Sequence, residues 1–151
     1  MTANTPTVQL LTDQGQTAIL KVTGYYTAAN DSDTIILAAN TLAWANANAD
    51  SNVCTLSISK IQYASDMAEG FVQLYWVGAN SNAEIVTFGT SQAGKFDAFI
   101  PNNAGVPQGQ IGLAVSGSAA NDSFNFIVTI NKEKGFDRAF VAYNDNTFKP
   151  A

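Results

Sequence analysis

The stretch SFNFIVTIN, residues 123–131, decides the fold class of this chain. Its apolar side chains fall on every second position, at Phe124, Phe126, Val128 and Ile130, with Ile127 as the one exception between them. An alternation of this kind has the period of a β-strand that buries one face and exposes the other. The segment therefore predicts a strand that packs against a hydrophobic core.

The same period recurs in AILKVTG (residues 18–24), VCTLSIS (53–59), FVQLYWVG (71–78) and GQIGLAVSG (109–117). Clusters rich in Gly, Asn, Asp and Pro, such as TDQGQ and IPNNAGVPQG, separate these runs and favour turns. We therefore predict an all-β chain, an antiparallel β-sandwich that is jelly-roll-like and has about eight strands. The expected core positions are Leu20, Val22, Leu56, Ile58, Leu74, Trp76, Leu113, Val115, Phe124, Phe126 and Val128.

Three local features refine this prediction. The run VCTLSISKIQY moves its apolar residues from even to odd positions, which indicates a β-bulge or corner near Ser59 and Lys60. Gly112 and Ala114 leave one face of their strand open to a close approach. The segment NTLAWANANA, residues 40–49, predicts at most a turn or two of helix.

Composition excludes most catalytic chemistry. The chain has no histidine, which excludes Ser-His-Asp and Cys-His catalysis and histidine metal sites. Its single cysteine, Cys54, lies in an apolar run and is expected to be a small buried hydrophobe. We therefore expect no cofactor, no metal and no enzymatic activity.

Two groups of carboxylates offer alternatives to this expectation. Asp31 and Asp33 in NDSD offer oxygen ligands for Ca²⁺, but the further acids and the distal Glu of an EF-hand are missing. Asp66 and Glu69 are the closest acid pair of the kind that glycosidases use, without a sequence signal for a cleft. Both groups are interpreted as turn or loop residues.

The charge balance points to protein partners. Charged residues make up 13% of the chain, its formal net charge is -5, and it contains 15 asparagines. A surface of neutral polar groups is buried at a protein interface with little desolvation of charge, whereas nucleic acid needs a basic footprint. The basic group Lys132, Lys134 and Arg138 is interleaved with acids and is expected at a solvated strand end. The sequence shows no signal peptide and no membrane span, so we expect a soluble protein made in the cytoplasm.

The pentapeptide AANDS occurs twice, at residues 28–32 and 119–123, each time before a β-prone run. A duplicated unit is one interpretation, and a recurrent turn is the favoured one, since Asn and Asp bond to nearby backbone. Asn121 and Asp122 are thus expected to open the last strand structurally. The residues Phe71, Tyr75 and Trp76 are expected to pack in a core or interface, with a carbohydrate platform as the alternative.

Residues 99–136 resemble a group of small β-rich proteins encoded by tailed bacteriophages, especially marine and cyanobacterial ones. The resemblance rests on IPNNAG at residues 100–105, GQIGL at 109–113, SGSAAND at 116–122 and the alternating strand at 124–130. It implies a jelly-roll-like virion protein and carries over no catalytic or ligand residue. The last residues, AFVAYNDNTFKPA, extend beyond the point where the group's domain is expected to finish.

The expected function is that of a capsid decoration (cement) protein, which binds the outer surface of a phage head and contacts the major capsid protein. One alternative is a neck, tail or fibre-associated virion protein, and another is a carbohydrate-binding host-recognition module. No direct contact with nucleic acid or membrane is expected. The protein would be located in the virion after assembly in the host cytoplasm.

We divide the chain into a β-sandwich domain, residues 1–137, and a C-terminal extension, residues 138–151. The extension places Phe140, Tyr143 and Phe148 among small polar residues, which suggests an arm that grips a neighbouring chain. The alternative is a last edge strand of the same domain. Because symmetric assembly multiplies weak contacts, we expect a homotrimer, with a dimer as second choice.

Overall fold

A computed structural model describes residues 6–26, 32–43, 45, 54–117 and 119–136 of the chain. These residues form nine β-strands and one 3-10 turn. The strands are β1 Thr7–Gln14, β2 Thr17–Tyr25, β3 Ser32–Ala38, β4 Thr55–Asp66, β5 Phe71–Ser81, β6 Ala83–Phe88, β7 Ala93–Pro101, β8 Gly105–Ser116 and β9 Ser123–Lys134. The 3-10 turn, η1, is Ala39–Thr41.

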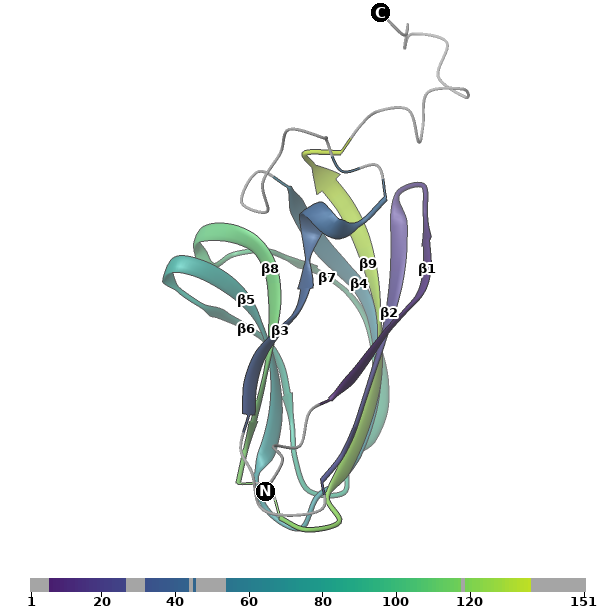
Figure 1. The fold of residues 1–151 in the computed structure, drawn as a ribbon, viewed down its shortest axis with the longest axis vertical. Helices are drawn as coiled ribbons and strands as arrows, with labels where there is room; N and C mark the ends of the chain where they lie inside the picture. Colours follow the sequence, from purple (N-terminus) through teal and green to yellow (C-terminus); the bar gives the residue numbers. More distant parts are fainter. Residues whose placement is uncertain (1–5, 27–31, 44, 46–53, 118, 137–151) are drawn as a thin grey trace, which may run out of the picture.

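The strands form two sheets that lie face to face (Figure 1). One sheet has the order β1-β2-β9-β4-β7 and the other has the order β3-β8-β5-β6, and all paired strands are antiparallel. From β2 to β9 the chain alternates between the sheets, apart from the β5–β6 hairpin. This connectivity is that of an eight-stranded jelly roll. The predicted antiparallel sandwich is confirmed, and β1 is an additional strand at one edge.

The core lies between the two sheets where the sequence predicts it. All eleven expected core positions are at most 3% exposed. The rings of Phe88 on β6 and Phe126 on β9 meet edge to face across the two sheets, with centroids 5.8 Å apart. Cys54 is also fully buried, and its thiol donates a hydrogen bond to the carbonyl oxygen of Gly135 at 3.3 Å. The expectation of a buried, unreactive cysteine is thus supported by its packing.

The change of parity in β4 corresponds to a bulge. The register of β4 shifts between Ile58 and Lys60 against both neighbours, β7 and β9. Ser59 is the extra residue of β4 relative to β9, so apolar side chains on both sides of it reach the core. Ile58 and Ile61 are both fully buried. The predicted bulge near Ser59 and Lys60 is confirmed.

The turn before β9 is held by Asp122, which is 3% exposed. Its carboxylate accepts hydrogen bonds from the backbone N–H groups of Ala119 at 2.6 Å and Ala68 at 2.8 Å. Asn121 has φ +72°, and its side-chain oxygen accepts a hydrogen bond from the Tyr25 hydroxyl at 3.0 Å. Asp122 therefore ties its own turn to the β4–β5 loop, which is the structural role that the sequence predicts. Asn121 contributes to the turn through its left-handed backbone conformation and through the hydrogen bond that it accepts from Tyr25.

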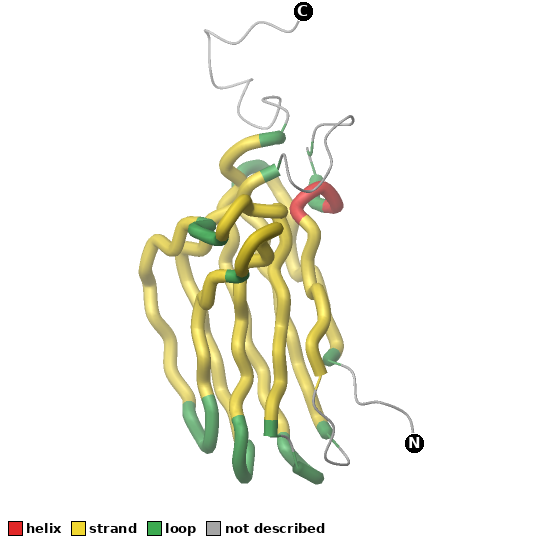
Figure 2. Tube along the Cα trace, turned by 90° about the vertical axis from the view of Figure 1, so that its left-hand side faces the viewer, coloured by secondary structure: helices red, strands yellow, loops and turns green. Residues whose placement is uncertain are grey.

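Lys132 is not at a solvated strand end, and this expectation is wrong. Its side chain is fully buried, and its ammonium group lies 2.5 Å from Asp13 Oδ1 and 2.8 Å from the carbonyl oxygen of Ala43. The second oxygen of Asp13 accepts a hydrogen bond from the Ala43 N–H at 2.6 Å. This ion pair thereby fixes the segment after η1 to β1 and β9. Figure 2 shows η1, in red, at one end of the sandwich.

The predicted segment 40–49 is described only in part, at residues 40–43 and 45. The 3-10 turn ends at Thr41, and most of the remaining predicted segment lies outside the described residues. Within the described part of the chain, no helix is long and apolar enough to span a membrane.

Candidate functional site

The first candidate surface is the apolar edge strand β1. Val8 and Leu10 pair with the core residues Val22 and Leu20, so both side chains lie on the core-facing side of their sheet. They are nevertheless 39% and 45% exposed. Leu11 is the extra residue of a bulge between Leu10 and Thr12 and is 50% exposed. The edge of the larger sheet therefore presents three adjacent apolar side chains to solvent.

This edge differs from the three other sheet edges. Charged residues are a common device against unwanted edge-to-edge pairing. Exposed charges occur on β3 (Asp33), on β6 (Glu84) and on β7 (Lys95 and Asp97). The only charged residue of β1 is Asp13, which is paired with the buried Lys132. The apolar part of β1 thus lacks the protection that the other edges have.

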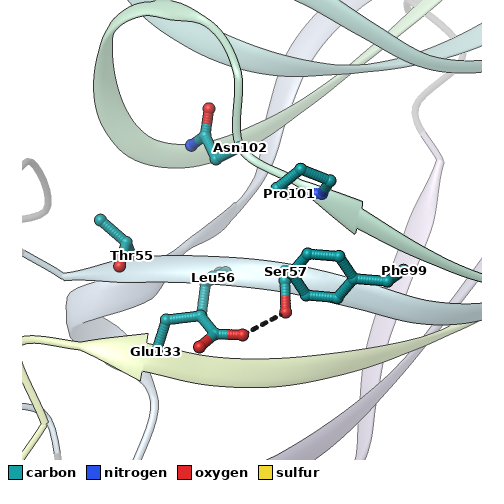
Figure 3. A pocket seen from close by; sticks show the side chains of 7 residues that line it. All are labelled: Thr55, Leu56, Ser57, Phe99, Pro101, Asn102 and Glu133. Atoms are coloured by element: carbon teal, nitrogen blue, oxygen red, sulfur yellow. Dashed lines mark hydrogen bonds between the residues drawn. The ribbon is translucent and has the colours of Figure 1, made fainter.

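The second candidate surface is an open pocket of about 240 Å³ near the opposite edge of the same sheet (Figure 3). It is lined by Thr55, Leu56, Ser57, Phe99, Pro101, Asn102 and Glu133. Two irregularities of pairing bring these residues together. Ala98 and Phe99 of β7 lie opposite Ser59 alone, and Glu133 of β9 is an extra residue opposite the Thr55–Leu56 step. Bulges of this kind redirect side chains and occur frequently next to functional sites.

The pocket combines one exposed aromatic ring with four polar side chains, those of Thr55, Ser57, Asn102 and Glu133. Phe99 is 66% exposed, the most exposed large apolar residue described. Ser57 is 1% exposed, and its hydroxyl donates a hydrogen bond to Glu133 Oε1 at 2.5 Å. Asn102 Oδ1 accepts a hydrogen bond from the Ala104 N–H at 3.1 Å. Its Nδ2 atom is buried and has no hydrogen-bond partner among the described residues.

The contact between Ser57 and Glu133 does not make a nucleophile. A nucleophilic serine has to reach a substrate carbonyl, whereas Ser57, although it belongs to the pocket lining, is only 1% exposed. Its hydroxyl is used to orient the Glu133 carboxylate. The pocket is therefore equipped for binding and not for acyl transfer.

The carboxylates that the sequence singled out are not gathered into a site. Asp31 lies outside the described residues, and Asp33 accepts a hydrogen bond from the Tyr75 hydroxyl. Asp66 lines a separate pocket of about 190 Å³, and Glu69 is not among the residues of that lining. In the described ranges, no three His, Cys, Asp or Glu residues cluster in a way that would hold a metal ion.

The aromatic residues of β5 do not form a carbohydrate platform. Trp76 is fully buried and faces the core, whereas Phe71 and Tyr75 lie on the opposite face of the sheet. Tyr75 is only 8% exposed, which leaves Phe71, at 40%, as the exposed ring of the three. Core packing is the correct interpretation for Trp76.

The predicted interface residues Phe140, Tyr143 and Phe148 lie outside the described residues, as does the predicted extension 138–151. The proposed arm and the boundary at residue 137 remain predictions. Sequence reasoning missed β1 as an apolar edge and missed the pocket around Phe99. A signal for the pocket exists in the stretch FDAFIP, where two phenylalanines three positions apart break the strand period.

No protein-family model and no curated protein sequence matches this chain. Among solved structures, a protein from the study of Bacillus endospore appendages that form disulfide-linked pili aligns over 88% of this chain and 92% of its own, with 12% identity and a TM-score of 0.41. A family 29 carbohydrate-binding module complexed with mannohexaose aligns over 87% and 93%, with 9% identity and a TM-score of 0.40. The Yersinia pseudotuberculosis-derived mitogen aligns over 88% and 97%, with 14% identity and a TM-score of 0.39. Likenesses of this size say nothing about the role of this chain.

Proposed function

We propose that this protein is a non-enzymatic virion protein, a capsid decoration (cement) protein that binds the outer surface of a tailed-phage head. The apolar edge of β1 carries the proposal. A sheet edge with exposed apolar side chains and no free charge pairs readily with other chains. Such an edge in a folded protein is expected to be covered in the working assembly.

The partner proposed for this edge is the major capsid protein. Val8, Leu10 and Leu11 are each about half exposed, so covering each one stabilises the complex by about 1 kcal/mol. The backbone of β1 pairs with β2 on one side, and on its other side no strand of the described residues pairs with it, so we propose that a partner strand adds there. A homotrimer would multiply these modest contacts through effective concentration. The low charge of the chain supports docking onto protein with little desolvation cost.

The resemblance to phage proteins gives independent support. The segment that carries it, residues 99–136, contributes the end of β7 and the whole of β8 and β9. These two strands pair with β2, β3, β4 and β5, so the segment lies at the centre of both sheets. The resemblance supports a virion role, and the exposed apolar edge of β1 supports attachment to another protein surface, which we propose to be that of the head.

The test is binding to isolated phage heads that lack this protein. Leu11→Lys places a charge on the exposed edge of β1, and Ile35→Lys is the matched control on edge strand β3, since Ile35 is 45% exposed. We expect Leu11→Lys to weaken co-sedimentation with heads at least about tenfold and Ile35→Lys to leave it unchanged. Both variants should keep the melting temperature of the native protein. Equal binding by both variants would exclude β1 as the attachment edge.

Binding assays with purified heads and with purified tails distinguish a head location from a neck, tail or fibre location. A decoration protein binds purified heads, whereas a tail or fibre protein binds tails and leaves heads bare. Binding to tails alone would overturn the head assignment and keep the virion role.

A further inference from the structure

We propose that the outer face of the smaller sheet of one molecule binds the outer face of the larger sheet of a second copy of this chain. The two faces carry opposite charge and lie on opposite sides of the sandwich (Figure 1). The inference does not depend on attachment to heads, because it uses the faces of the two sheets and not the edge of β1.

The outer face of the smaller sheet is acidic. Its charged residues are Asp33 on β3 and Glu84 on β6, and both lie on the side of the sheet that faces away from the core. The Tyr75 hydroxyl donates a hydrogen bond to the Asp33 carboxylate, and the Gln73 amide donates one to Glu84 at 2.9 Å. No lysine or arginine occurs in β3, β5, β6 or β8. We call this surface the acidic face.

The outer face of the larger sheet has three lysines at its centre. Lys21 on β2 and Lys95 on β7 belong to one row across the sheet, in which Ile127 and Gln62 lie between them. Lys60 on β4 lies in the next row. Lys21 alternates with core residues along β2, so its side chain points away from the core. We call the surface around Lys21, Lys60 and Lys95 the basic face.

The three lysines are not neutralised by salt bridges on their own face. Among the residues that the structure describes, the only salt bridge is that of Asp13 and Lys132. Asp97 is paired in register with the lysine of β4 but forms no salt bridge with it. Asp66 and Glu133 belong to the ends of β4 and β9, away from the central rows. The two central rows therefore hold three described lysines against one acid.

The charges on the two faces have matching spacing. Asp33 and Glu84 lie on the two edge strands of the four-stranded sheet. Lys21 and Lys95 lie on β2 and β7, with β9 and β4 between them. Each pair thus spans three strand spacings, roughly 14 Å. The two acids occupy adjacent rows, an offset that flexible lysine side chains can follow. Two stacked sheets can therefore form both charge pairs at once.

Neutral and apolar side chains accompany the charges on both faces. Ile35 and Phe71 on the acidic face are 45% and 40% exposed. Ile19 and Ile127 lie on the basic face and are partly exposed. Covering apolar side chains between complementary charges is the usual composition of a protein interface.

A second copy is the partner that these faces favour, because both complementary surfaces belong to the same chain. Two acidic faces repel each other, as do two basic faces, so a symmetric dimer through either face is disfavoured. A head-to-tail contact leaves one face of each kind free in a dimer, and it continues to a closed ring or an open stack. A ring of three copies would be the homotrimer that the sequence predicts.

The experiment exchanges the charges of the two faces. Lys21→Glu with Lys95→Glu makes both faces acidic, and Asp33→Lys with Glu84→Lys makes both faces basic. Sedimentation velocity measures each double variant alone, their equimolar mixture and the native chain, at about 100 μM protein and about 20 mM NaCl. We expect the native chain to associate, each double variant to stay monomeric and the mixture to form complexes that contain both. Raising NaCl to about 0.5 M should weaken native association at least about tenfold.

Controls keep charge reversal apart from loss of fold. Glu69→Lys reverses one acid in the loop between β4 and β5, outside both faces, and should associate as the native chain does. Melting temperatures check that the variants fold. If Asp33→Lys does not fold without its bond from Tyr75, Glu84→Lys alone replaces the double variant and should weaken association at least about tenfold. A monomeric native chain, variants that associate like the native chain, or a mixture that stays monomeric would each overturn the proposal.

Self-association and head binding are measured separately. Ile35 lies on the acidic face, so head binding by Leu11→Lys and by its control Ile35→Lys is compared at a concentration at which the chain is monomeric. Absence of self-association would overturn this inference and leave head binding through β1 untouched. Absence of head binding would leave the result of the mixing experiment untouched.

Discussion

The hydroxyl group of Tyr75 donates a hydrogen bond to the carboxylate of Asp33, and its ring crosses Gly112 to do so. Tyr75 lies on β5 and Asp33 on β3, with β8 between them. A Cβ atom at Gly112 would lie 2.2 Å from Cζ of the tyrosine ring, so only glycine leaves room for this crossing. The close approach that the small residues of β8 predict is made by this ring.

This contact predicts a loss of stability at alkaline pH. Burial and the hydrogen bond to Asp33 raise the pKa of Tyr75 from its ordinary value of 10 to about 12. The folded state therefore holds a proton that the unfolded state has already lost, and this contribution disappears as pH rises from about 10 to about 12. Urea unfolding should show a shallower decline over this range for Tyr75→Phe than for the native chain. Parallel declines would contradict the assignment.

The buried ion pair of Asp13 and Lys132 predicts an asymmetric response to mutation. Asp13→Asn removes the charge that neutralises a fully buried ammonium group, and should lower the free energy of unfolding by about 3–5 kcal/mol. The double variant Asp13→Leu, Lys132→Met removes both charges and should lose less than Asp13→Asn alone. Lys95→Met on the exposed edge strand β7 serves as the control. A loss below about 1 kcal/mol for Asp13→Asn would show that the pair is solvated.

The burial of Phe126 predicts a large loss in the free energy of unfolding when its ring is removed. Its ring is fully buried and contacts Phe88 and Phe124, so Phe126→Ala should lower the free energy of unfolding by about 3–5 kcal/mol. Phe71→Ala, the same change at a 40% exposed position, should cost much less. Chemical denaturation of both variants measures the difference. Similar losses would mean that the ring of Phe126 is not at the centre of the core.

The parts of the fold that can be predicted from the sequence are those that the local spacing of apolar residues determines. The alternation around Phe124 and Phe126 gives the strand and its buried face, and the parity change at Ser59 gives the bulge. The burial of Lys132 could not be predicted in this way, because its partner Asp13 is 119 positions away and is brought close only by the pairing of β1, β2 and β9. Taken alone, the polar residues around Lys132 indicate a strand end that is exposed to solvent.

The candidate surfaces were harder to predict for a related reason. Leu11 breaks the alternation of β1 because it is a bulged residue, and β1 is the fifth strand of its sheet, whereas the opposite sheet has four. The pocket requires irregular pairing on both sides of β4, which places Phe99 and Glu133 near each other from distant parts of the chain. Periodicity describes regular strands and is least informative where strands become irregular.

The C-terminal extension gives a prediction from the sequence alone. Deletion of residues 143–151 should leave a folded β-sandwich and weaken the proposed trimer, because Tyr143 and Phe148 are removed. Light scattering after size-exclusion chromatography measures the mass, and thermal unfolding checks the fold. A truncated chain that no longer folds would show that the segment is a last strand of its own domain and not an arm.

The most direct test of the central claim is a density map of the intact phage particle in which this chain is found. We expect the jelly roll on the outside of the head, in numbers comparable with the major capsid protein, with Val8, Leu10 and Leu11 of β1 against the capsid surface. Its absence from the head, or a head-bound orientation in which β1 faces solvent, would contradict the account.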